Sequence, residues 1–226
     1  MLIALGVWQL DRADQKRSHY EMLIQRQSEG VININQNLAR INNKDEMLGR
    51  KIVAEGRFNE NIQILLDNQV MKNRAGYFVF TPFSLAGHDT WYLVNRGWVA
   101  IGGERNQLPG LTRTNGVVSI SGTAMNVPAT GIRLGEIIDE QLAPGIYRLQ
   151  AIDIAHLSKL IGVTFMPYII RLEPVSQYGY ARMWDRPDSG ENIHLAYALQ
   201  WFLLAITLFL IYIIVNLEKV QDSENR

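Results

Sequence analysis

The residue whose side chain is best suited to a chemical role is His194, which lies at the start of a long apolar run near the C-terminus. An imidazole nitrogen is a common axial ligand of haem iron, and ionisable groups at membrane depth often serve a function. On a helical wheel a stripe of small and large side chains falls within about 40° of His194: Ala198, Trp201, Ala205, Leu208 and Tyr212. One interpretation is a haem ligated by His194 and packed on this stripe. The alternative, which the residues alone favour, is an interfacial histidine among lipid headgroups.

A second group of candidates lies in the aromatic segment TWYLVNRGWVAI. Strand alternation places Tyr92, Val94, Arg96 and Trp98 on one face. In one interpretation Arg96 makes a cation–π contact or binds an anionic group. In the other, Arg96 pairs with a carboxylate inside the sheet and Gly97 marks a β-bulge. The second interpretation is the simpler one and is favoured here.

A basic stripe follows the N-terminal apolar segment. Five residues fall within about 80° of one another on a helical wheel: Leu5, Trp8, Arg12, Lys16 and His19. The functional interpretation is a surface that meets phosphates or carboxylates near a membrane. The alternative is snorkelling of long basic side chains at a helix end, which is favoured because it needs no ligand.

Several kinds of chemistry have no residues to support them. The chain has no cysteine, which excludes thiolate zinc, iron–sulfur clusters and thiol-based copper carriers. Its 22 basic and 22 acidic side chains give zero net charge, which argues against a nucleic-acid-binding protein. The sequence contains no glycine-rich phosphate loop, nucleophile elbow or H-E-x-x-H motif. We therefore expect no catalysis, no nucleotide, no zinc and no copper.

The apolar run that follows His194 is expected to be the membrane segment that positions it. The 21 residues from Leu195 to Val215 carry no charge, and as a helix they span roughly 31 Å, the thickness of a bilayer's hydrocarbon core. Apolar residues occupy every face, unlike a core helix of a soluble protein. We expect a transmembrane helix over residues 193–217 and a short tail over 218–226.

The N-terminal end resembles part of a membrane helix. Residues 1–10, MLIALGVWQL, are apolar but cover roughly 15 Å of helix, about half a bilayer. They lack the basic start and cleavage site of a signal peptide. We expect the C-terminal half of a first transmembrane helix, apparently truncated, with further apolar sequence upstream of Met1.

Between these ends lies a β-rich region. Residues 11–50 are expected to form a polar helical extension and a linker, and 51–192 a β-rich domain. Seven strand-like runs occur: 51–58, 62–68, 76–83, 90–101, 116–125, 147–152 and 165–173. One helix is expected over 153–161, with Asp153 as N-cap and Gly162 as its stop. The predicted fold is mainly β, a small antiparallel barrel or sandwich with one short helix, bracketed by transmembrane helices.

Read in order, several motifs resemble the surfeit locus 1 family, the membrane assembly factors of cytochrome c oxidase. They begin with Leu5-Gly6-Val7-Trp8-Gln9, Arg12 and Lys16, and continue with Asp67-Asn68, Gly76-Tyr77, Thr81-Pro82, Leu93-Val94-Asn95-Arg96-Gly97-Trp98-Val99 and Pro167-Tyr168. They end with His194-Leu195-Ala196-Tyr197-Ala198-Leu199-Gln200-Trp201-Phe202. The ordered set covers nearly the whole chain and is far more specific than any single piece.

The resemblance implies a non-enzymatic role in the maturation of oxidase subunit I, by holding and delivering haem a. It implies a multi-pass protein of the bacterial inner membrane, with the β-domain outside the cytoplasm. The implied partners are subunit I, haem a synthase and membrane lipid. The family's haem-linked histidine matches His194, whose iron contact would be the only metal site, and Trp201 and Tyr197 are the aromatic residues beside it.

Two other hypotheses remain open at this point. A haem-independent scaffold would stabilise an oxidase assembly intermediate through the β-domain, with Arg96 and Trp98 as its contacts. Copper delivery, a neighbouring step, is disfavoured because soft Cu(I) prefers thiolates or grouped thioethers, and the seven methionines are dispersed.

Overall fold

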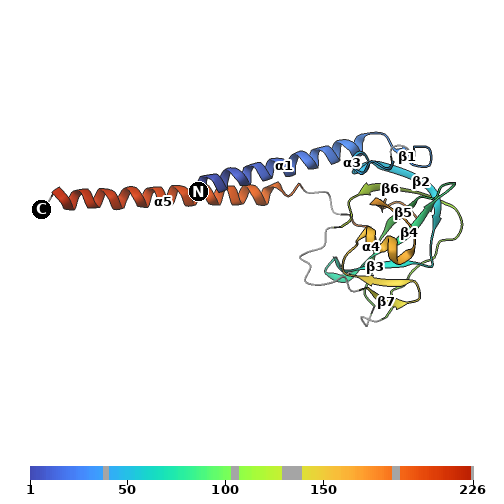
Figure 1. Ribbon diagram of the computed structural model, residues 1–226. Helices are drawn as coiled ribbons and strands as arrows, with labels where there is room; N and C mark the ends of the chain where they lie inside the picture. The colour runs from blue at the N-terminus through green and yellow to red at the C-terminus, as the bar shows by residue number, and fades with distance from the viewer. Residues whose placement is uncertain (38–40, 103–106, 129–138, 185–188, 225–226) are drawn as a thin grey trace. The chain divides into compact units, whose positions relative to one another are not determined.

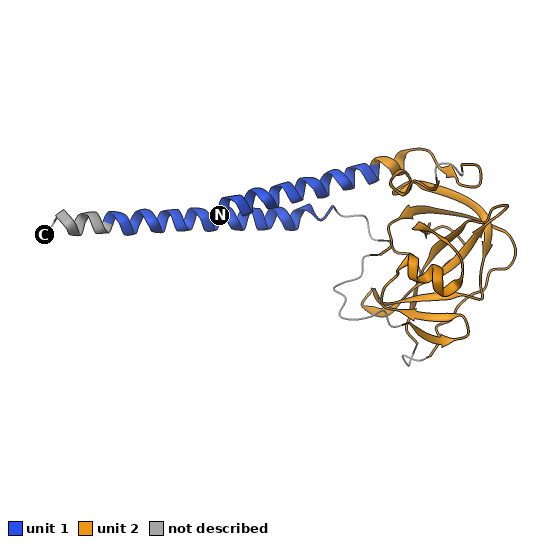
Figure 2. Cartoon of the chain, viewed as in Figure 1, with its two compact units in different colours: residues 1–24, 186–226 blue, residues 25–185 orange. Residues whose placement is uncertain are grey.

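The computed structural model describes residues 1–37, 41–102, 107–128, 139–184 and 189–224. The chain divides into two compact units (Figure 2). One unit comprises residues 1–24 and 186–226, and the other comprises residues 25–185. We describe each unit by itself.

The first unit consists of two long helices, which run side by side in opposite directions (Figure 1). Helix α1 covers Leu2–Ser28, and helix α5 covers Glu191–Glu224. Within α5, Glu191–Leu217 is long and apolar enough to cross a membrane. Among the described residues it is the one helix that meets this criterion, so the expectation of two bracketing membrane helices is confirmed only for the C-terminal one.

The described residues of the second unit form nine strands and two short helices. In chain order the strands are β1 (Ile32–Asn33), β2 (Lys51–Phe58), β3 (Gln63–Met71), β4 (Arg74–Leu85), β5 (Trp91–Ala100), β6 (Val118–Met125), β7 (Glu140–Ala143), β8 (Ile146–Leu149) and β9 (Phe165–Leu172). The helices are α3 (Lys44–Met47) and α4 (Ile154–Ile161). All seven strand-like runs of the sequence form strands, whereas the short β1 and β7 were not predicted.

Five strands close into a barrel in the order β2-β6-β9-β5-β4, because β4 pairs back onto β2. Strands β3, β8 and β7 continue the sheet from β4. The prediction of a small barrel is confirmed, but the sheet is mixed: the pairs β5–β9, β3–β8 and β1–β2 are parallel. Parallel pairs need long crossover connections, and the segment between β5 and β9 contains α4.

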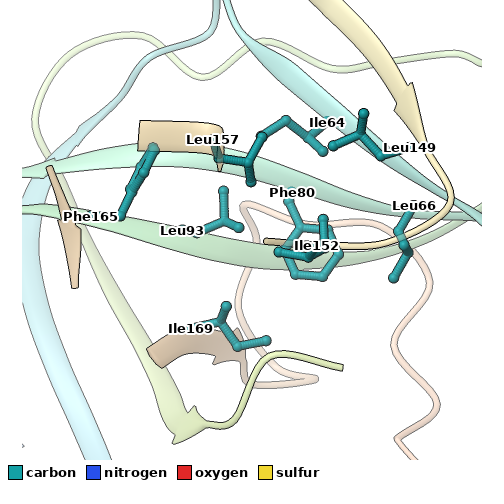
Figure 3. Close-up of a cluster of buried hydrophobic side chains, with 9 residues drawn as sticks. All are labelled: Ile64, Leu66, Phe80, Leu93, Leu149, Ile152, Leu157, Phe165 and Ile169. Carbon is teal, nitrogen blue, oxygen red and sulfur yellow. The ribbon is translucent and has the colours of Figure 1, made fainter. Parts of the chain in front are cut away.

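Helix α4 packs on an apolar cluster through Leu157, Ile154 and Ile161, and Figure 3 shows the buried side chains of this cluster. The buried members come from α4, from the segment just before it and from strands of the barrel and its extension: Ile64, Leu66, Phe80, Leu93, Leu149, Ile152, Leu157, Phe165 and Ile169. The helix begins and ends as the sequence predicts. Asp153 accepts a hydrogen bond from the His156 amide, and Gly162 adopts the left-handed conformation at φ 79°.

The opposite face of the same strands carries aromatic side chains into the barrel. Tyr92 pairs across the strands with Phe83, which in turn pairs with Phe58, and all three are buried. The rings of Tyr92 and Tyr168 lie 5.9 Å apart between centroids. Burial raises the pKa of Tyr92 to about 12 and also raises the pKa of Tyr168. The barrel interior is therefore a filled aromatic core.

Residues 30–37 and 41–50, which lie in the segment expected to be part of a linker, belong to this second unit. Strand β1 pairs with β2, and Ile34 and Met47 are both fully buried. The asparagine-rich sequence does not indicate this packing, because Asn35 uses its side chain to bind the backbone of β2. The side chain accepts a hydrogen bond from the Glu55 amide and donates one to the Glu55 carbonyl. The described parts of the segment are therefore folded structure rather than linker.

Candidate functional site

His194 lies in the first turns of α5, where the chain enters the apolar span. Glu191 occupies the first turn of the helix, where a carboxylate interacts favourably with the helix dipole. The His194 side chain is half-buried, because α1 runs alongside this part of α5 (Figure 1). The histidine therefore lies at the start of the candidate membrane helix, with one side against α1.

The contact on that side is a hydrogen bond to Gln9 of α1. Nδ1 of His194 and Oε1 of Gln9 are 2.8 Å apart, and the contact is partly buried. An amide oxygen can only accept, so Nδ1 carries the proton and donates it. In a neutral imidazole the other ring nitrogen, Nε2, then presents a lone pair. Such a nitrogen can bind a metal ion or accept a proton.

The stripe below His194 is not free for a macrocycle along its whole length. Ala198 is 1% exposed, and a Cβ added at Gly6 of α1 would lie 2.6 Å from the ring of Phe202. Helix α1 therefore covers the first part of the stripe. Further along, Leu208 and Tyr212 are 57% and 66% exposed. The sequence-based picture of a ring packed on Ala198 needs correction, because that position is occupied by α1.

The two aromatic candidates beside His194 differ in their surroundings. Trp201 is half-buried, whereas Tyr197 is 50% exposed. Tyr197 follows His194 by three residues, which makes the two side chains neighbours on the helix surface. Tyr197 is thus the ring that a group bound outside the helix pair meets first.

The basic stripe of α1 lies on the helix surface. Trp8 is 48% exposed, and the Arg12 guanidinium lies over its ring at 5.6 Å. Arg12 also donates to Gln15 at 3.0 Å, while Lys16 is exposed. An arginine resting on an interfacial tryptophan agrees with the snorkelling interpretation.

Arg96 is the centre of a buried polar cluster at one end of the barrel. Its side chain is 0% exposed, and NH1 donates to the Glu60 carboxylate at 2.8 Å. Nε donates to the Tyr178 carbonyl at 2.8 Å, and NH2 donates to the Thr114 hydroxyl at 3.0 Å. The guanidinium also stacks over the Phe58 ring at 4.6 Å. The carboxylate pair expected from the sequence is confirmed, and it occurs together with the cation–π contact that was its rival.

The bulge at Gly97 is also confirmed. The register of β4 against β5 shifts so that Val79 pairs with Gly97 while Phe80 pairs with Asn95. Arg96 is the extra residue, and Gly97 has φ 116°, which L side chains rarely adopt. The bulge is what turns Arg96 toward the end of the barrel.

The same bulge moves Trp98 to the other face of the sheet. Trp98 pairs with Phe78, which packs with Phe80 against the cluster under α4. Trp98 is 8% exposed, and its Nε1 donates to the Gln69 carbonyl at 2.9 Å. Simple alternation, which placed Arg96 and Trp98 on one face, is therefore wrong at this point, because one inserted residue reverses the side-chain direction.

The segment after β9 is attached to β5 beside this bulge. The Tyr180 amide donates to the Arg96 carbonyl at 2.7 Å, and the Trp98 amide donates to the Ala181 carbonyl at 2.8 Å. Burial lowers the pKa of the Arg182 guanidinium, and the nearby charge of Arg96 lowers it further. Arg96 and Trp98 therefore serve the interior of the domain, and neither side chain forms an exposed contact surface.

Sequence reasoning missed the partners that complete both clusters. Glu60 lies in a turn among asparagines, where nothing marks a buried carboxylate. Gln9 carried a weak signal: it is the polar residue on the α1 face that also contains Gly6 and Ala13, which are both buried. A single polar residue on a face of small residues is a pattern typical of helix pairs in membranes.

Comparison with known proteins matches the chain to one protein family and to several relatives. The model described as SURF1 family matches residues 1–206. A SURF1-like protein of Rickettsia felis is 28% identical over 226 residues, which cover 95% of this chain and 91% of the relative. SURF1-like proteins of Rickettsia conorii and Rickettsia prowazekii are 28% and 26% identical over 228 residues, again 95% of this chain, and 86% and 84% of those relatives.

Proposed function

The chain belongs to the SURF1 family, known broadly as oxidase assembly factors, and from this membership we propose that it assists the maturation of subunit I of cytochrome c oxidase by holding and delivering haem a. The proposal makes it a membrane-anchored carrier and not an enzyme. Its cofactor would be haem a, bound transiently or stably, with no copper, zinc or nucleotide.

One observation carries the haem part of the proposal: the hydrogen bond between Nδ1 of His194 and Oε1 of Gln9. Histidine ligands of metals commonly donate their second ring N–H to an oxygen acceptor, which fixes the ring and its tautomer. His194 has this arrangement through Oε1 of Gln9. Nε2 is then the nitrogen that would bind iron, at the half-buried start of a membrane-spanning helix.

The residues around His194 fit a haem in their chemistry. Haem a, when bound, supplies an iron that accepts an axial imidazole nitrogen and a large apolar ring. The exposed surface of α5 is apolar along the span, which suits such a ring. Tyr197 is the exposed aromatic neighbour of His194, and Trp201 is half-buried one turn further on. We assign the ring contact to Tyr197 first and to Trp201 second.

The setting and the partners follow from the same proposal. The apolar α5 supports association with a membrane. We place the protein in a bacterial inner membrane as a multi-pass protein, with the β-domain outside the cytoplasm. Subunit I would receive the haem, haem a synthase would supply it, and lipid would surround α5.

The test is a titration of the detergent-purified chain with haem a, followed by absorption spectroscopy. We expect the wild-type protein to give the spectrum of a histidine-ligated haem and His194→Ala to lose that spectrum and bind far more weakly. His19→Ala is the matched control, because His19 is an exposed histidine of α1. An unchanged spectrum and affinity in His194→Ala would refute His194 as the ligand.

The alternative, a haem-independent scaffold, loses the contact residues expected for it, because Arg96 and Trp98 are buried. A co-purification experiment separates the two functions. If His194→Ala still captures subunit I as well as the wild type does while the oxidase matures normally, scaffolding is the function. If subunit I is captured but lacks haem a, the carrier function is supported.

A further inference from the structure

Helix α1 holds one polar side chain against the imidazole of His194. Gln9 and His194 are 185 positions apart in the sequence, yet Oε1 and Nδ1 are 2.8 Å apart. Both side chains are half-buried, so the hydrogen bond is partly shielded from solvent. A bond formed in such surroundings is stronger than one in water, and breaking it leaves an unpaired polar group.

We propose that Gln9 is a positioning residue that fixes the tautomer of His194 and so makes Nε2 the ligand nitrogen. The inference rests on the proposed function, since it assigns a role toward the haem that His194 would hold. A neutral imidazole has one N–H, the Gln9 oxygen accepts it at Nδ1, and Nε2 is left with a lone pair. Without this acceptor, either nitrogen can carry the proton.

The hydrogen bond depends on how closely the two helices approach. Gly6 lies three residues before Gln9, on the same side of α1. A Cβ at Gly6 would lie 2.6 Å from the Phe202 ring, too close for an unshifted helix pair. On α5, Ala198 is 1% exposed at the contact. Small residues at both positions let the backbones come near each other, which brings Gln9 within reach of His194.

It follows that the readiness of His194 to bind iron is coupled to the pairing of α1 with α5. When the helices are paired, the ring is oriented and its tautomer is set. When they are apart, the histidine has neither restraint. Gln9 contributes a neutral acceptor, so the ring is fixed without a fixed negative charge beside it.

The test begins without haem. Nitrogen-15 NMR of the histidine rings in the detergent-solubilised full chain reports which nitrogen carries the proton, and His194→Ala assigns the signal among the four histidines. We expect an Nδ1–H tautomer in the wild type, a mixture in Gln9→Leu, and recovery in Gln9→Glu, which restores an acceptor oxygen. Gln200→Leu is the matched control, because Gln200 is an exposed glutamine of α5.

Haem a binding is then measured for the same variants. We expect Gln9→Leu to bind about 10- to 100-fold more weakly, the usual loss when the acceptor behind a ligand histidine is removed, and Gln9→Glu to retain most of the affinity. An unchanged His194 tautomer in Gln9→Leu overturns the inference, whatever the haem result. Failure of the wild type to bind haem a overturns the proposed function instead, and the NMR comparison shows separately whether Gln9 sets the tautomer.

Discussion

Replacing Arg96 by methionine should destabilise the β-domain more than any surface substitution. The guanidinium is 0% exposed and forms its ion pair with Glu60, whose side chain is 10% exposed. Methionine removes the cation and keeps much of the apolar stem. The carboxylate then stays in place, held by the Thr114 amide at 2.8 Å and the Gln63 side-chain amide at 2.7 Å, but without its counter-charge.

The magnitude follows from that uncompensated charge. Removing one partner of a buried ion pair typically costs about 3–5 kcal/mol. Loss of the cation–π contact with Phe58, at 4.6 Å, acts in the same direction. For a domain of this size each kcal/mol lowers Tm by about 2–4 °C, so the expected fall in Tm is about 6–20 °C. The Tm of Arg96→Lys should lie between those of the wild type and Arg96→Met, because lysine keeps the charge and loses the forked hydrogen bonds.

The assay is unfolding of the full chain in detergent, followed by tryptophan fluorescence. Trp98 is 8% exposed and its backbone pairs with Ala181 beside Arg96, so it reports on this region. Arg57→Met is the control, since Arg57 is exposed on β2, and it should change stability by less than about 0.5 kcal/mol. If Arg96→Met and Arg57→Met unfold at the same midpoint, the Arg96–Glu60 pair does not stabilise the domain and the reasoning is refuted.

Two further predictions concern the backbone and the barrel interior. Gly97→Ala should lower the free energy of unfolding in urea more than Gly87→Ala does. Both glycines have positive φ, but only at Gly97 would the new Cβ meet the Ala181 carbonyl, at 2.7 Å. Equal losses of stability in the two variants would exclude this close approach as a cause. Because burial raises the pKa of Tyr92 to about 12, above its ordinary value of 10, the protonated phenol stabilises the fold below pH 10 and this contribution is lost as the pH rises toward 12. Tyr92→Phe should remove part of that alkaline loss in a series of unfolding curves, and an unchanged pH profile would contradict it.

Local pattern was enough to predict several elements of this protein. The strand over Lys51–Phe58 and the helix over Ile154–Ile161 follow from alternation and from caps at Asp153 and Gly162. The candidate membrane span follows from an uninterrupted apolar run in α5. Each of these signals depends on residues that are close in the chain, and the physical forces behind them act over a few residues.

Local sequence pattern did not predict the structure correctly where one inserted residue changes the strand geometry, or where segments far apart in the sequence meet. The inserted residue Arg96 reverses the direction of Trp98, although the glycine that permits the bulge was visible. Strand β1 is too short to alternate, so its pairing with β2 appears only in the folded sheet. The sequence indicated a bulge but could not place every side chain around it.

His194 shows the same difference between what local sequence predicts and what the tertiary structure determines. The sequence alone determined that a histidine begins an apolar helix, and that the ordered motifs resemble one family. Only the tertiary structure decided that Gln9 faces the ring and that α1 covers Ala198. The reason is that a hydrogen bond across 185 positions depends on how two helices pack, which the small side chains at Gly6 and Ala198 permit but no local pattern specifies.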